Sequence, residues 1–130
     1  MIRQAIFSLL LVFSCDFLGP TKINFISDFD LIDAKEIDYI LIDVRTSDEF
    51  SSGYIKNAMN LDFYSETFQN DILSIDKNLA VVLYCRTNNR STKTANILKE
   101  NGFKEISVLE GGITEWVKRG NDINYTTYSE

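Results

Sequence analysis

The stretch "LAVVLYCRTNNRST", residues 79–92, decides how the rest of this 130-residue chain is interpreted. It begins with a continuous apolar run, which is typical of a strand buried on both faces of a parallel sheet. Cys85 ends that run, and the sequence then turns polar before a helical pattern begins. A thiol at the end of a buried strand, with Arg86 and Arg90 close behind it, indicates chemistry rather than packing alone.

Two further apolar runs, "YILIDVR" (39–45) and "EISVLEGG" (105–112), predict strands of the same kind. Helical spacing of apolar residues, together with helix-start and helix-end residues such as Thr46 or Ser47, Gly102 and Gly120, predicts helices over residues 46–53, 65–76, 91–102 and 113–120. This alternation predicts an α/β fold with a mainly parallel central sheet and helices on both faces. Ligands bind beyond the carboxyl ends of the strands in such sheets, where Cys85 and Asp43 lie.

Composition narrows the possible functions. The chain is 45% apolar, enough for one globular domain, and its net charge of −6 with no Lys/Arg cluster argues against a nucleic-acid partner. The sequence has no histidine, which excludes Ser-His-Asp and Cys-His nucleophiles and HExxH zinc sites. Only two cysteines are present, which excludes a cysteine-rich zinc site. We therefore expect no metal and no other cofactor.

The N-terminus differs from the rest of the chain. Arg3 is followed by an uncharged apolar run up to Cys15, shorter than the roughly 20 residues that span a bilayer. This pattern predicts an export signal over residues 1–14, with a buried N-terminal helix or strand as the alternative. "LVFSC" (11–15) resembles a bacterial lipoprotein signal, in which the cysteine is lipidated. We expect a membrane-anchored lipoprotein facing the periplasm or cell exterior, or alternatively a soluble periplasmic protein. If Cys15 carries lipid, Cys85 is the one remaining free thiol.

The chain then divides into four parts. We predict an export signal, a short tether, one domain and a polar C-terminal tail, over residues 1–14, 15–22, 23–120 and 121–130.

The turn after residue 84 is suited to an ionised sulfur. A strand–loop–helix turn directs backbone N–H groups and a helix N-terminus at its centre, which favours an anion. A thiolate at Cys85 would also be stabilised by Arg86 and Arg90. A buried cysteine is alternatively a small apolar residue, but the two arginines and Ser91 favour a nucleophile.

Three motifs resemble one known family. "CRTNNRS" (85–91) resembles the active loop of rhodanese-like sulfurtransferases, C-R-x-G-x-R-S. "LIDVRTSDEFSSGYIKNAMNL" (41–61) is similar to the family segment L-I-D-V-R…E-F…G-H-I-x-G-A-x-N-I, and "LEGGITEWVKRG" (109–120) to its closing L-x-G-G-x-x-x-W motif. The likeness extends over residues 23–120.

The resemblance implies an enzyme that moves sulfane sulfur. Its cysteine takes sulfur from a small anionic donor such as thiosulfate, becomes a persulfide and passes the sulfur to a thiol or to an acceptor like cyanide. By position, Cys85 is the nucleophile, and Asp43 and Arg45 either support the loop or form a core pair. The substrate-binding positions are Arg86, Thr87, Asn88, Asn89, Arg90 and Ser91. We expect a monomer that touches a membrane only through lipid at Cys15.

Three positions depart from the family pattern. Asn88 replaces the loop glycine, and if this position needs a positive φ, asparagine tolerates it with some strain. Tyr54 stands in place of a histidine and Lys56 in place of a proline, and both are interpreted as structural.

Two other functions remain as alternatives. One is a non-catalytic docking module of the same fold. The other is a phosphatase or an arsenate-reductase-like enzyme, whose loops have the longer spacing C-x5-R, whereas Cys85 and Arg90 are spaced C-x4-R.

Overall fold

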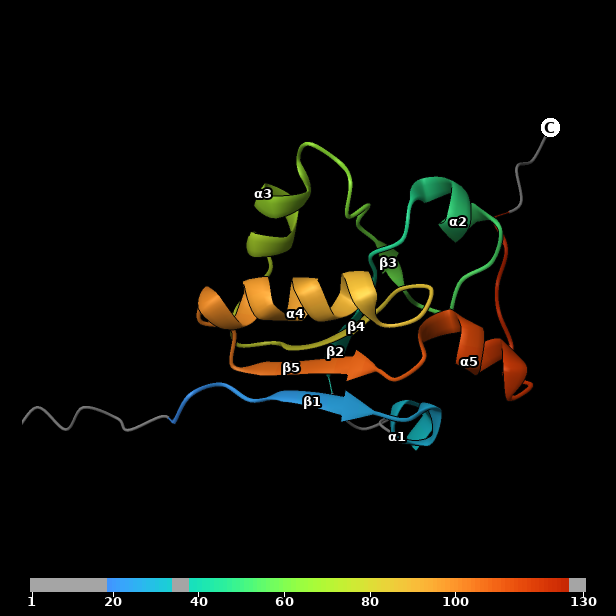
Figure 1. Cartoon of the computed structure of the whole chain (residues 1–130), viewed down its shortest axis with the longest axis horizontal. Helices are drawn as coiled ribbons and strands as arrows, with labels where there is room; N and C mark the ends of the chain where they lie inside the picture. The colour runs from blue at the N-terminus through green and yellow to red at the C-terminus, as the bar shows by residue number, and fades with distance from the viewer. Residues whose placement is uncertain (1–18, 34–37, 127–130) are drawn as a thin grey trace, which may run out of the picture.

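The computed structural model of the chain describes residues 19–33 and 38–126 (Figure 1). Strands and helices alternate along this part of the chain. In order they are β1 (Ile23–Ile26), α1 (Asp28–Asp33), β2 (Tyr39–Asp43), α2 (Ser47–Ser51), β3 (Met59–Asn60), α3 (Phe68–Leu73), β4 (Ala80–Tyr84), α4 (Asn89–Glu100), β5 (Glu105–Leu109) and α5 (Gly112–Lys118).

The strands form one sheet in the order β1-β5-β4-β2-β3, and every pair of neighbours is parallel. The predicted α/β fold with a parallel sheet is therefore confirmed. Because all strands point the same way, their carboxyl ends share one edge. Figure 1 shows α2, α5 and the loop that leads into α4 gathered at that edge. The central strand β4 delivers Cys85 to the middle of it.

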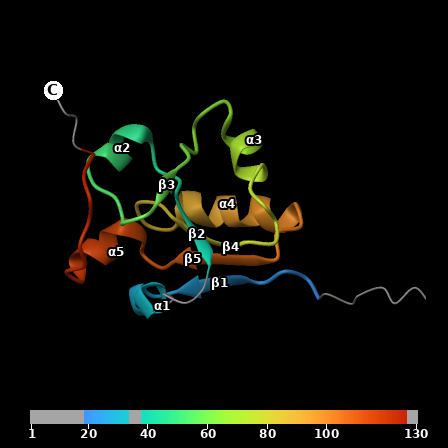
Figure 2. The same cartoon turned by 180° about the vertical axis from the view of Figure 1, so that it is seen from behind.

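Both faces of the sheet are covered, which explains why its central strand β4 is apolar throughout. α3 and α4 pack on one face, where Ile72 and Leu98 are completely buried with Leu83. α1 and α5 cover the other face, where Leu31 and Trp116 pack with Val82 and Tyr84. Figures 1 and 2 show these two layers from opposite sides. Successive residues of β4 thus point into different cores, and Cys85 belongs to the one beneath α4.

The predicted strands and helices are all present, with shifted ends. The helix expected over residues 91–102 begins two residues earlier, because Thr92 N–H already donates to the Asn88 carbonyl. Three short elements were not predicted: β1, α1 and β3. Two of the four residues of β1 are exposed and β3 has only two residues, so neither gives an apolar run.

The segment after α5 is attached to the domain as far as the structure describes it. Asn124 and Tyr54 exchange two backbone hydrogen bonds of 2.8 Å, and Ile123 packs against the core that contains Trp116. Asp28, at the start of α1, accepts from Arg119 and Asn121 at 2.7 and 2.8 Å. Residues 119–124 therefore fasten the segment after α5 to Asp28 and to Tyr54.

The predicted export signal over residues 1–14 lies outside the described residues, and so does Cys15, the predicted site of lipid attachment. Within residues 19–33 and 38–126, every helix is too short or too polar to cross a membrane.

Candidate active site

Cys85 lies immediately after β4 and is fully buried at the bottom of the β4–α4 loop. Its Sγ is 3.3 Å from the Ser91 hydroxyl oxygen and 3.5 Å from the Ser91 backbone nitrogen, which donates to it. Ser91 is in the first turn of α4 and is itself completely buried. The loop between the two residues thus folds back around the sulfur atom.

The carbonyl groups of the loop are held from outside by α5. Ile113 N–H donates to the Cys85 carbonyl at 3.0 Å, and Thr114 N–H donates to the Arg86 carbonyl at 3.1 Å. Gly112 makes this approach possible, because a Cβ there would lie 2.4 Å from the Cys85 oxygen. The turn at Gly111 and Gly112 therefore braces the loop.

The backbone N–H groups of residues 86–90 are not used as donors in any hydrogen bond of the described chain. Residues 86–89 are exposed, and Arg86 forms no ion pair with another described residue. Uncommitted amides and a free guanidinium favour a bound anion at this loop.

Arg90 is differently placed. Its two terminal nitrogens donate to the two carboxylate oxygens of Glu49 at 2.7 and 2.9 Å, a bidentate ion pair between α4 and α2. The guanidinium also lies 5.8 Å from the ring centroid of Tyr64. The hydrogen bond from Arg90 lowers the pKa of Glu49 to about 2, and the same contact raises the pKa of Arg90.

Glu49 is held by its own helix as well. Its carboxylate accepts from the Thr46 backbone nitrogen at 2.9 Å and from the Thr46 hydroxyl at 3.0 Å, which completes a capping box at the start of α2. The buried Arg45 donates to the Glu49 carbonyl at 3.2 Å and to the Gly53 carbonyl at 2.7 Å. A chain of contacts therefore leads from β2 through α2 to the loop around the sulfur.

Asp43 and Arg45 form an ion pair of 2.6 Å in the core. Arg45 fixes α2, which presents Glu49 to Arg90, so this pair lies two contacts away from the loop. The Asn60 side chain donates to the carbonyls of both residues of the pair, at 3.0 and 2.9 Å.

Asn88 does not adopt the conformation that its replacement of a glycine suggested. Its φ is −135°, outside the left-handed region, so the predicted strain is absent. Its side-chain oxygen accepts from Gly111 N–H at 3.0 Å, a second link between the loop and the turn before α5. Thr87 is exposed in the same loop, and Asn89 is exposed at the start of α4.

Glu49 and Tyr64 are the neighbours of this site that sequence reasoning missed. The signal for Glu49 was its place in the "EF" of the motif over residues 41–61. Tyr64 has no such signal, since it lies in an irregular segment after β3.

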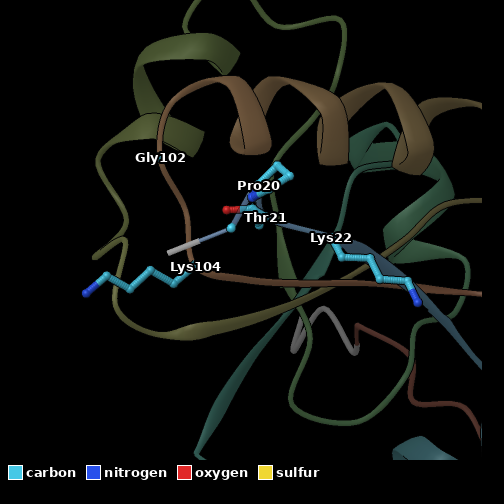
Figure 3. Close-up of a pocket in the computed structure, with 6 residues that line it drawn as sticks. Pro20, Thr21, Lys22, Gly102 and Lys104 are labelled. Carbon is cyan, nitrogen blue, oxygen red and sulfur yellow. The ribbon is translucent and has the colours of Figure 1, made fainter. Parts of the chain in front are cut away.

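A cavity of about 540 Å³ lies at the other edge of the sheet, by the amino ends of β1 and β5 (Figure 3). It is lined by Gly19, Pro20, Thr21, Lys22, Gly102 and Lys104. The side chains of Lys22 and Lys104 point away from one another in Figure 3, and the cavity has no part in the cysteine site.

Comparison with known proteins agrees with this geometry. The family model of the rhodanese-like domain matches residues 30–119, which is more than half of the sequence. The chain therefore belongs to the rhodanese-like domain family. A rhodanese-like domain protein from Staphylococcus aureus is similar in structure, with a TM-score of 0.67 and 27% identity over 80% of this chain and 99% of that one. A rhodanese-related protein from Thermoplasma volcanium has the same fold, with a TM-score of 0.69 and 24% identity, covering 79% of this chain and 99% of that one.

Curated relatives are longer proteins. The tRNA uridine(34) hydroxylase of Wigglesworthia glossinidia brevipalpis is 33% identical over 105 residues, which are 76% of this chain and 32% of the relative. The protein of the same name from Hamiltonella defensa is 36% identical over 90 residues, or 65% of this chain and 25% of the relative. The chain thus spans about a quarter to a third of the length of these relatives.

Proposed function

We propose that this rhodanese-like domain is a sulfurtransferase in which Cys85 carries the transferred sulfur as a persulfide. The observation that supports it most directly is the position of the Cys85 sulfur. The Ser91 backbone N–H donates to it, the Ser91 hydroxyl lies 3.3 Å from it, and the adjoining loop has five backbone N–H groups without an acceptor in the described chain. Such a setting suits a thiolate and, one bond further out, a persulfide anion.

The proposed reaction balances without a general acid. The Cys85 thiolate attacks the outer sulfur of thiosulfate, an S–S bond to the cysteine forms, and the S–S bond of the donor breaks with release of sulfite. The terminal sulfur of the persulfide then bonds to a nucleophile such as cyanide, and the thiolate leaves. Sulfite is a stable anion and needs no proton on departure, so a chain without histidine can perform both steps.

We do not propose the tRNA in the names of the longer relatives as a substrate of this chain. The match covers only 32% and 25% of those proteins. This chain also has a net charge of −6, whereas affinity for nucleic acid comes mainly from basic groups on phosphate. The described residues are better suited to a small anion than to tRNA, because Arg86 and the backbone N–H groups of the loop can bind such an anion.

Intact-mass measurement tests the proposal. After incubation with thiosulfate, we expect the purified protein to gain the mass of one sulfur atom and to lose it on addition of cyanide or a thiol. Cys85→Ser is expected to gain nothing. A folded wild-type protein that gains no sulfur from thiosulfate or from a second sulfur donor would contradict the proposal and favour a docking module.

A further inference from the structure

The two arginines of the loop differ in how much of their charge is free. Arg86 is exposed and forms no ion pair within the described residues. Arg90 directs both terminal nitrogens at Glu49, and its side chain is only 13% exposed. A bidentate carboxylate pair is among the stronger charge-assisted contacts and fixes the plane of the guanidinium.

The pairing of Arg90 is maintained from the other side too. Two Thr46 donors hold one oxygen of the Glu49 carboxylate, and Arg45 holds its backbone carbonyl. The pKa of about 2 keeps Glu49 ionised at neutral pH. An incoming anion would have to displace a carboxylate that is already oriented and already charged.

From this arrangement we infer that Glu49 is a positioning residue that holds the Arg90 guanidinium out of anion binding. The charged end of the sulfur donor is then received by Arg86 and the loop amides alone. This inference rests on the proposed function and deepens it, because it sets how strongly the site binds anionic donors and products. Moderate affinity suits turnover, since sulfite has to leave after each transfer.

Sulfite binding tests the inference without requiring any sulfur transfer. We expect Glu49→Gln to free the guanidinium and to tighten the dissociation constant for sulfite, measured by titration calorimetry, about tenfold. Asp28→Asn is the matched control, because it also turns an ion-paired carboxylate into an amide, but its partner is Arg119 and the Glu49–Arg90 pair stays in place. It is expected to bind sulfite as the wild type does. Circular dichroism and thermal melting establish that each variant is folded.

A third variant distinguishes two possible causes of tighter sulfite binding, which are the release of the Arg90 guanidinium and the loss of the negative charge of Glu49. In Glu49→Gln combined with Arg90→Met, the gain in sulfite affinity should disappear. A gain that persists in the double variant, or a Glu49→Gln protein that binds sulfite no more tightly than the wild type, would overturn the inference.

Turnover provides an independent readout. Glu49→Gln should lower the KM for thiosulfate and also lower kcat, since the released sulfite is held longer. Loss of folded protein would lower the apparent kcat alone. A wild-type protein that forms no persulfide overturns the proposed function, while the sulfite titration still decides the role of Glu49.

Discussion

Ser91 gives the buried sulfur two possible donors from a single residue. Its backbone N–H already donates to Sγ, whereas its hydroxyl lies 3.3 Å from Sγ and also 3.2 Å from the Asn88 carbonyl, to which it can donate instead. The hydroxyl proton can therefore turn toward the sulfur when Cys85 is ionised and toward the carbonyl when it is not. The hydrogen bond from the Ser91 hydroxyl to the sulfur is stronger when the sulfur is charged than when it is neutral.

Replacing Ser91 by alanine should slow persulfide formation from thiosulfate by about tenfold, because one donor to the thiolate is lost. Stopped mass measurement at short times gives the rate. Thr94→Val is the matched control: Thr94 is equally buried in the same helix, but its hydroxyl donates to the Arg90 carbonyl at 2.8 Å and not to sulfur. Equal rate losses in both variants would show that the effect is only structural.

At the scale of elements, α5 shapes a loop to which it contributes no side chain. Its first N–H groups hold the carbonyls of Cys85 and Arg86, which leaves the amides of the loop for a ligand. Close approach depends on Gly112, whose φ of +56° and lack of a Cβ both matter. The contact is backbone to backbone, so neighbouring side chains cannot relieve a clash by rotating.

We predict that Gly112→Ala destabilises the protein by about 2–4 kcal/mol, since left-handed strain of about 1 kcal/mol adds to an overpacking term of about 1–3 kcal/mol. Urea unfolding measures this difference. Gly120→Ala provides the comparison: its φ is +83°, but nothing lies within 4 Å of an added Cβ. It should cost about 1 kcal/mol, the strain alone. If the two variants are equally destabilised, the close approach to Cys85 has no energetic weight.

Helices and strands could be predicted where neighbouring residues in the sequence form a recognisable pattern. Buried parallel strands leave continuous apolar runs, and the strand before Cys85 was recognisable for that reason. The pairing of Glu49 with Arg90 was not, because they are 41 positions apart. It depends on β2 lying beside β4, which no local pattern encodes. The geometry of Asn88 also came from outside its own segment, from the turn before α5.

For the whole molecule, ion pairs between elements predict how stability depends on pH. The pKa of Glu49 is lowered from 4.5 to about 2 by Arg90, and that of Asp28 is lowered by Asn121 and Arg119. A carboxylate with a lowered pKa in the folded state stabilises the protein above its unfolded pKa. This stabilisation is lost as the pH falls toward the folded pKa.

The free energy of unfolding should therefore fall between about pH 5 and about pH 3, as urea titrations at the two values can measure. Glu49→Gln should show a smaller fall than the wild type, because one of the titrating pairs is gone. An equal fall in both proteins would mean that the Glu49–Arg90 pair adds nothing to the stability of the fold.

The order of the strands also has a consequence for how the protein folds during its synthesis. Among the strands of the described residues, β1 comes first and pairs only with β5, which brings Ile23 opposite Ile106. A ribosome adds about 5–20 residues per second, so the first strand waits for several seconds before the segment that completes it has been made. During that interval the Ile23–Ile26 strand lacks its partner strand and is available to chaperones. The sheet is complete only once the segment of β5, Glu105–Leu109, has been made.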